Sequence, residues 1–167
     1  IELIIVWNRL LVKNIPQQLN GEDEMITLNN SSDYAATVLR LALGAMYLAH
    51  GLLKLLVFTP EGTAGFFGSL GLPAFLGPLT MGLEIAGGVA LIFGVYSRWI
   101  ALALIPVLLG SIVLVHGQNG WGFGNEGGGW EYPAFLIAAS VVQFLLGNGA
   151  FALQQDKTNA IVAKPAA

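Results

Sequence analysis

The chain of 167 residues contains no cysteine and few charged residues. Without cysteine it can form no disulfide, no thiolate metal site and no dithiol redox centre, so any redox role would need a borrowed cofactor or a partner subunit. Charged residues make up 10% of the chain and hydrophobic residues 55%, whereas soluble domains are about 25% charged. A net charge of -3 gives no indication of a nucleic-acid partner. The composition therefore indicates an integral membrane protein whose first partner is the lipid bilayer.

Between residues 34 and 152 the chain has seven charged side chains, and long apolar runs separate them. They are Arg40, Lys54, Glu61, Glu84, Arg98, Glu126 and Glu131. Four runs are long enough to cross a bilayer, which takes a helix of ~20 residues: 34–58, 74–95, 98–116 and 132–146. Ser32 or Asp33 could cap the first helix, and Pro106 is expected to bend the third. The sequence predicts an all-α fold, a bundle of four transmembrane helices.

The distribution of basic residues predicts the orientation of this bundle. The loops 59–73 and 117–130 contain neither lysine nor arginine. The basic residues Arg40, Arg98, Lys157 and Lys164 all fall on the opposite side. Because cytoplasmic loops are enriched in lysine and arginine, both termini should be cytoplasmic and both loops external. We therefore expect a multi-pass protein of the bacterial inner (plasma) membrane, with Arg40 and Arg98 as anchors at the inner face.

The ends of the chain differ from its apolar middle. Residues 1–24 lack an initiator methionine, precede Met25 and carry six of the 17 charges. They are either translated upstream sequence, with Met25 as the true start, or a short amphipathic or disordered arm. The apolar stretch 1–12 is too short and too interrupted to span a membrane. We expect a membrane domain at 33–153 and a flexible C-terminal tail at 154–167.

Five ionisable side chains are expected to converge in the outer half of the bundle: His50, Lys54, Glu84, His116 and Glu131. Lys54 follows Arg40 by 14 residues, and Glu84 precedes Arg98 by 14. Both should therefore lie roughly 21 Å from the inner boundary, at ~1.5 Å per residue. An isolated charge at mid-membrane costs ~2.5–3.5 kcal/mol, so an inward-facing pair of Lys54 with Glu84 is the favoured arrangement.

Other interpretations of these residues stay open. Lys54 could extend to the lipid headgroups while Glu84 is protonated, or the two could form a structural clamp without chemistry. His116 precedes Gly117 at a helix end, where a histidine is more often a hydrogen-bonding cap than a ligand. The two histidines with Glu84 or Glu131 could ligate haem or a metal, but no motif indicates this, and we assign no metal site.

Several sequence blocks resemble the DoxX family of small membrane proteins. They are HGLLK at 50–54 after Arg40 and Gly44, TAGFF at 63–67, LGLP at 70–73, EIAGG at 84–88, SR at 97–98, His116, Glu131 and GNG at 147–149. The resemblance covers residues 33–153. Residues 1–24 have no counterpart in the family pattern, and the loop 117–129, with seven glycines, is unusually rich in glycine.

The resemblance implies a four-helix inner-membrane protein, and its chemistry is suggested more weakly than its fold. A distant relative resembles the quinone-reducing subunit of a thiosulfate oxidoreductase, other members are linked to oxidative-stress or thiol-handling membrane complexes, and many have no assigned activity. The family's polar positions match His50, Lys54, Glu84, His116 and Glu131, and also Arg98. We expect a subunit of a membrane redox system, in which this cluster binds a quinone or another small molecule. No covalently bound cofactor is expected, and the partners would be a redox subunit or a second copy of the chain.

The alternative is a non-enzymatic membrane subunit, an assembly factor or a small transporter. Whether the chain is an enzyme, such as a quinone-linked oxidoreductase subunit, is not decided by the sequence.

Overall fold

A computed structural model describes the backbone of residues 21–154 and the side chains of residues 31–154. The chain divides into one unit that ends at Ser31 and a second that begins at Ser32. In the first unit the structure describes residues from Gly21 onward, and these are helical. The second unit holds the helices described below. Most of the expected N-terminal extension and all but the first residue of the expected tail lie outside the described residues.

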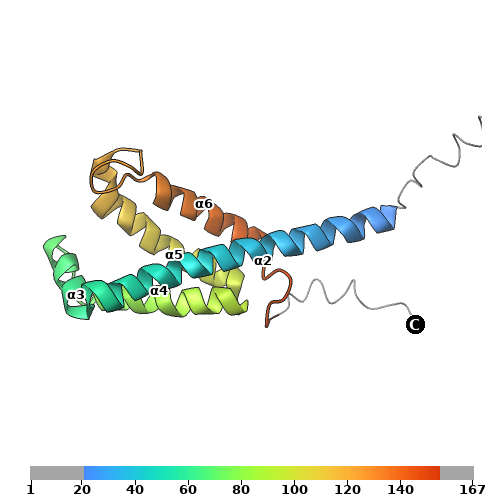
Figure 1. The fold of residues 1–167 in the computed structure, drawn as a ribbon, viewed down its shortest axis with the longest axis horizontal. Coiled ribbons are helices and arrows are strands. Elements are labelled where there is room, and N and C mark those ends of the chain that lie inside the picture. Colours follow the sequence, from blue (N-terminus) through green and yellow to red (C-terminus); the bar gives the residue numbers. More distant parts are fainter. Residues whose placement is uncertain (1–20, 155–167) are drawn as a thin grey trace, which may run out of the picture. The chain divides into compact units, whose positions relative to one another are not determined.

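The described residues form helices and no strand, which confirms the all-α prediction. The helices are α2 (Gly21–Leu53), α3 (Pro60–Ser69), α4 (Leu76–Phe93), α5 (Ser97–Ser111) and α6 (Glu131–Leu146). A π-helical turn, Lys54–Phe58, continues α2, and another, Ile112–His116, continues α5 before a short 3-10 turn, Gly117–Asn119. Figure 1 shows their arrangement.

The first helix begins earlier than we predicted. Ser32 and Asp33 do not cap a helix start, because α2 runs through them from Gly21. The polar residues before Tyr34 concealed this continuity, since the prediction was based on the apolar run alone. Pro106 lies inside α5, as expected.

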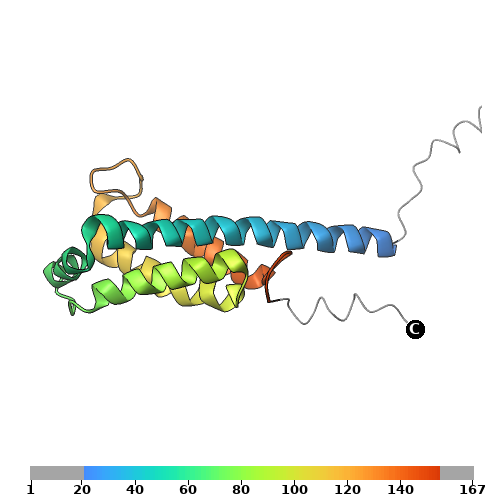
Figure 2. The same ribbon diagram turned by 60° about the horizontal axis from the view of Figure 1, so that its bottom comes forward.

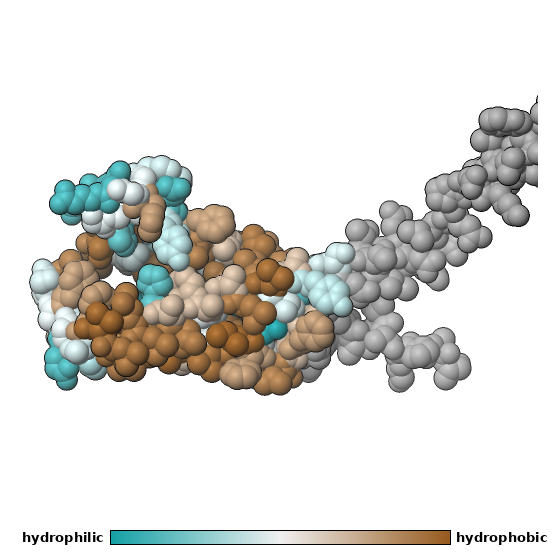
Figure 3. Space-filling view, in the orientation of Figure 1, coloured by the Kyte–Doolittle hydropathy of each residue, from teal (hydrophilic) through white to brown (hydrophobic). Residues whose placement is uncertain are grey.

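Three stretches of the described chain are long and apolar enough to cross a membrane: Ser31–Phe58, Leu76–Phe93 and Ser97–Asn119. The apolar helix α6 has 16 residues and is shorter. Large apolar side chains cover much of the visible face of the bundle in Figure 3, and Leu56 and Val113 are each 72% exposed. Such an exposed apolar surface suits contact with lipid and is unusual for a soluble monomer.

The core lies where α2, α4, α5 and α6 meet. Its buried residues include Leu43 and Tyr47 on α2, Leu91 on α4, Leu104 on α5 and Leu136 on α6. On α2, α5 and α6 the buried core residues lie three or four positions apart, the spacing that places side chains on one helical face.

Glycines bring α2 and α4 into close contact, and the two helices run side by side in Figures 1 and 2. A Cβ atom added at Gly88 would lie 2.6 Å from the backbone nitrogen of Leu48 and 2.8 Å from the carbonyl oxygen of Gly44. Only a residue without a side chain fits at this contact, as is common where membrane helices pack closely.

Arg40 holds one end of the bundle together. Its guanidinium donates hydrogen bonds to the carbonyl oxygens of Leu91 (2.9 Å), Ile92 (2.6 Å) and Ala150 (3.2 Å). The bonds to Leu91 and Ile92 satisfy carbonyls in the last turn of α4, where helical donors run out, and the bond to Ala150 reaches the segment after α6. They also bring the middle of α2, around Arg40, together with the end of α4 and the segment after α6.

The segment after α6 is tied to the same end. Asn148 accepts a hydrogen bond from the backbone nitrogen of Ser97 at 2.9 Å. Gln154 accepts one from the backbone nitrogen of Tyr96, also at 2.9 Å. The described residues after α6 therefore fasten it to the turn between α4 and α5.

Candidate functional site

Lys54 and Glu84 form an ion pair between α2 and α4. The Lys54 Nζ lies 2.7 Å from one carboxylate oxygen of Glu84 and 2.9 Å from the other. The side chain of Glu84 is 6% exposed and that of Lys54 is 20% exposed. The predicted pairing is thus present. Each charge provides the partner that an ionised group needs away from water.

The close approach of α2 and α4 brings the pair together. One turn before Lys54, a Cβ atom added at Gly51 would lie 3.0 Å from the backbone nitrogen of Ile85 and 3.2 Å from the Cβ of Glu84. Lys54 is also the first residue of the π-helical turn that ends the long helix. Such turns shift the following side chains relative to a regular helix.

His50 is an exposed residue of α2 and lies near Lys54 and next to the start of α6. Its ring stacks on that of Tyr132, with centroids 6.3 Å apart and an interplanar angle of 27°. The Tyr132 ring also meets Phe123 in an edge-on contact, at 5.8 Å. The polar cluster on α2 and α4 is therefore connected to α6 through an aromatic side chain.

His116 and Glu131 hold the glycine-rich loop between α5 and α6. The Nδ1 of His116 lies 2.9 Å from the carbonyl oxygen of Gly128. Glu131 accepts a hydrogen bond from the backbone nitrogen of Phe123, at 3.2 Å. The side chain of Asn119 stabilises the same loop by donating a hydrogen bond to the Gly128 carbonyl oxygen, at 2.9 Å. The described contacts of His116 and Glu131 are made within this loop, and those of Lys54 and Glu84 are made between helices.

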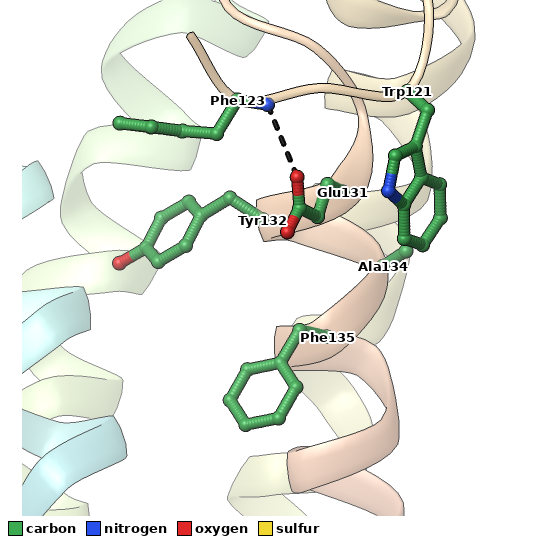
Figure 4. Close-up of a pocket in the computed structure, with 6 residues that line it drawn as sticks. All are labelled: Trp121, Phe123, Glu131, Tyr132, Ala134 and Phe135. Carbon is green, nitrogen blue, oxygen red and sulfur yellow. Dashed lines mark hydrogen bonds between the residues drawn. The ribbon is translucent and has the colours of Figure 1, made fainter.

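A cavity of about 680 Å³ opens beside this loop. It is lined by Trp121, Phe123, Glu131, Tyr132, Ala134 and Phe135. Figure 4 shows the Glu131 carboxylate between the side chains of Trp121 and Tyr132, and Phe135 farther along α6. The edge-on contact of Trp121 with Trp130, with centroids 4.5 Å apart, supports one wall.

The two expected anchors lie at the opposite end of the bundle from the cavity. Arg40 is 2% exposed and caps α4, so its side chain is internal and does not extend to a lipid surface. Arg98 is half-buried, and its guanidinium carbon lies 5.9 Å from the ring centroid of Phe144 on α6. This distance allows a cation–π contact.

Comparison with known proteins gives the family of the chain. The DoxX family model matches residues 35–117. A curated protein of Bacillus subtilis (strain 168), described as "Putative oxidoreductase CatD", is 32% identical over 126 residues, which cover 75% of this chain and 89% of that protein. The chain belongs to the DoxX family. No solved structure matched it.

Two buried hydroxyls of this DoxX protein were not predicted as site residues. Tyr47 is 1% exposed, and its hydroxyl lies close to that of Ser140, which is 0% exposed. Within the described residues, neither hydroxyl makes a hydrogen bond of good geometry. The sequence gives no signal for a polar role of Tyr47, because a tyrosine on the apolar face of a helix is most simply explained by packing.

The remaining missed residues line the cavity. Trp121 and Tyr132 are expected at a membrane boundary from their residue type, but Phe123 and Phe135 carry no such signal. Among the described residues, no group of three or more histidine, aspartate or glutamate side chains is arranged to hold a metal ion. The ion pair and its neighbours can therefore offer a ligand hydrogen-bond donors and the carboxylate of Glu84.

Proposed function

We propose that this DoxX protein is the membrane subunit of a redox system and that it binds a quinone, or a similar small molecule, near Lys54 and Glu84. The observation that carries the proposal is the ion pair at 2.7 Å inside an apolar bundle, with His50 close to it. Ionisable groups within membrane helices are commonly functional.

The residues present suit a quinone head group. Its two carbonyl oxygens accept hydrogen bonds, and the ammonium of Lys54 and the ring of His50 can donate them. The Glu84 carboxylate can accept and return a proton. A bound quinone would supply reversible two-electron, two-proton chemistry. Because the sequence contains no cysteine, the protein would obtain electrons from a partner subunit or from a bound reductant.

The proposal includes four membrane spans, with α6 as the fourth. Its 16 residues rise about 24 Å, slightly less than the ~30 Å hydrocarbon core. Phe135 and Leu145 are each 69% exposed on this helix, which suits contact with lipid. With Arg98 at one end and no lysine or arginine in the loops 59–73 and 117–130, the positive-inside rule supports both termini in the cytoplasm of a bacterial cell.

The second candidate is a non-enzymatic membrane subunit, an assembly factor or a small transporter. The observation that favours it is the completeness of the ion pair, since Lys54 contacts both carboxylate oxygens of Glu84. A pair that is satisfied in this way could serve only to hold α2 against α4.

Titration with a short-chain quinone separates the two candidates. The protein is reconstituted in lipid nanodiscs, and quinone binding is measured for the wild type and for the double variant Lys54→Met/Glu84→Gln. The double variant removes both charges together and so leaves no unpaired buried charge. The redox proposal predicts saturable binding by the wild type and at least about tenfold weaker binding by the double variant, equivalent to the loss of one good hydrogen bond to a charged group.

The matched control Glu61→Gln, at an exposed carboxylate of α3, should bind like the wild type. Equal binding by all three proteins would contradict the proposal.

A further inference from the structure

The cavity beside the α5–α6 loop combines one carboxylate with a wall of aromatic rings. Its volume of about 680 Å³ lies within the ~300–1,000 Å³ range of small-molecule sites. Trp121, Phe123, Tyr132 and Phe135 supply four aromatic side chains, and Glu131 supplies the charge. Figure 4 shows that the carboxylate lies among these rings.

The negative charge of Glu131 is not neutralised by a basic side chain of the described chain. Residues 117–130 contain no lysine or arginine, and the described ion pair of Lys54 is with Glu84. Glu131 accepts one hydrogen bond, from the backbone nitrogen of Phe123. The positive end of α6 compensates for roughly half a charge at most, so the cavity keeps a net negative character.

This combination selects for a cation. Aromatic faces attract substituted ammonium groups, and a carboxylate adds direct charge attraction. Carbonyl-bearing neutral molecules and anions gain nothing from the carboxylate. The site therefore differs in its chemistry from the donor-rich cluster around Lys54 and His50.

The position of the cavity indicates an apolar body on the ligand. Phe135 lies one turn beyond Glu131 on α6 and is 69% exposed, and Ala134 completes the same wall. A ligand with its charge at Glu131 would thus extend its apolar part along α6, over a surface that suits lipid.

We propose that this cavity binds a lipid-soluble organic cation, with a substituted ammonium group held between Glu131, Trp121 and Tyr132. This proposal does not depend on quinone binding and stands or falls separately. The ammonium group could belong to a free amphiphile or to the headgroup of a membrane lipid, and the experiment distinguishes these sources.

The test is equilibrium dialysis of benzyltrimethylammonium against the full chain in phosphatidylglycerol nanodiscs, which contain no ammonium headgroup. Empty nanodiscs measure binding to lipid. Saturable binding by the wild type is expected, and Glu131→Gln should bind at least about tenfold more weakly because the charge is removed. The glutamine oxygen can still accept the hydrogen bond from Phe123, so the loop should keep its fold. Glu126→Gln, which removes the same charge from the same loop outside the cavity, should bind within about twofold of the wild type.

Two further comparisons keep the proposal falsifiable if Glu131→Gln disturbs the loop. Trp121→Leu should weaken binding several-fold, whereas Trp99→Leu, an exposed tryptophan at the opposite end of the bundle, should not. Neopentylbenzene, the neutral analogue with carbon in place of nitrogen, should bind more weakly than benzyltrimethylammonium. Equal affinity for the neutral analogue, or equal loss in Glu126→Gln and Glu131→Gln, would overturn the proposal.

A final arm identifies the source of the ammonium group. After correction for the accumulation of the cation that empty nanodiscs of each lipid show, the added cation will bind more weakly in phosphatidylethanolamine than in phosphatidylglycerol if phosphatidylethanolamine headgroups occupy the cavity, and this difference will disappear in Glu131→Gln. If the wild type binds the cation equally in both lipids, a free amphiphile is the ligand. Both results require the charge of Glu131, and binding that is independent of this charge in both lipids would refute the site.

Discussion

Removing the charge of Lys54 alone should strongly destabilise the bundle. Glu84 is 6% exposed, and the Lys54→Met variant would leave its carboxylate buried without a partner. The expected loss in the free energy of unfolding is about 3 kcal/mol, at the lower end for broken buried pairs because Lys54 keeps some exposure. Replacing both charges, in Lys54→Met/Glu84→Gln, should return stability to within about 1 kcal/mol of the wild type.

Equilibrium unfolding in mixed micelles with increasing sodium dodecyl sulfate, followed by circular dichroism, measures these differences. The two single variants and the double variant form a cycle whose coupling energy should be about 2 kcal/mol or more. Glu61→Gln, at an exposed carboxylate, should change stability little. If the single losses simply add in the double variant, the two side chains do not stabilise each other and the reasoning is wrong.

Three other predictions concern the fold and its orientation. Gly88→Ala should destabilise the fold by at least about 2 kcal/mol, because its Cβ would lie 2.6 Å from the backbone of the neighbouring helix. The control Gly82→Ala, on the same helix but in open space, should leave stability unchanged, and thermal unfolding compares the two variants. Arg40→Met should lower stability by about 3 kcal/mol or more in the same assay, since three carbonyl acceptors lose a charged donor; an unchanged unfolding temperature would contradict this. The chain has no cysteine, so Glu126→Cys should react with an impermeant maleimide from outside the cell and Tyr96→Cys only after lysis; the reverse pattern would invert the topology.

The helical part of the fold could be predicted because its signals are local. Apolar runs and the rise of a regular helix placed Lys54 and Glu84 at matched depths. Charge balance in an apolar environment then favoured the pairing that the structure contains. These inferences need only distances along single helices.

The loop and the ends of the helices could not be predicted in the same way. His116 and Glu131 were expected to converge with Lys54 in the outer half of the bundle, but nothing in the sequence indicated their contacts with Gly128 and Phe123 of the α5–α6 loop. The path of a loop with seven glycines between 117 and 129 depends on backbone conformations that glycine permits but does not specify. The early start of α2 was likewise missed because polar residues can continue a helix that apolar periodicity does not mark.

The burial of Arg40 shows a further limit. The positive-inside rule counts an arginine near a helix start as an anchor, and it does not distinguish an arginine at the headgroups from one that caps a neighbouring helix. The capping bonds reach residues 51, 52 and 110 positions away in the sequence. Contacts between such distant segments follow from the assembled bundle.

The most direct test of the proposed function is the amount of quinone that accompanies the protein purified from its native membrane. Protein extracted in mild conditions should carry quinone in near-stoichiometric amount when organic extracts are quantified by mass spectrometry. The Lys54→Met/Glu84→Gln variant, inserted and folded to the same extent, should carry little. Equal quinone content in the two proteins, or none in the wild type, would contradict a quinone site at this ion pair.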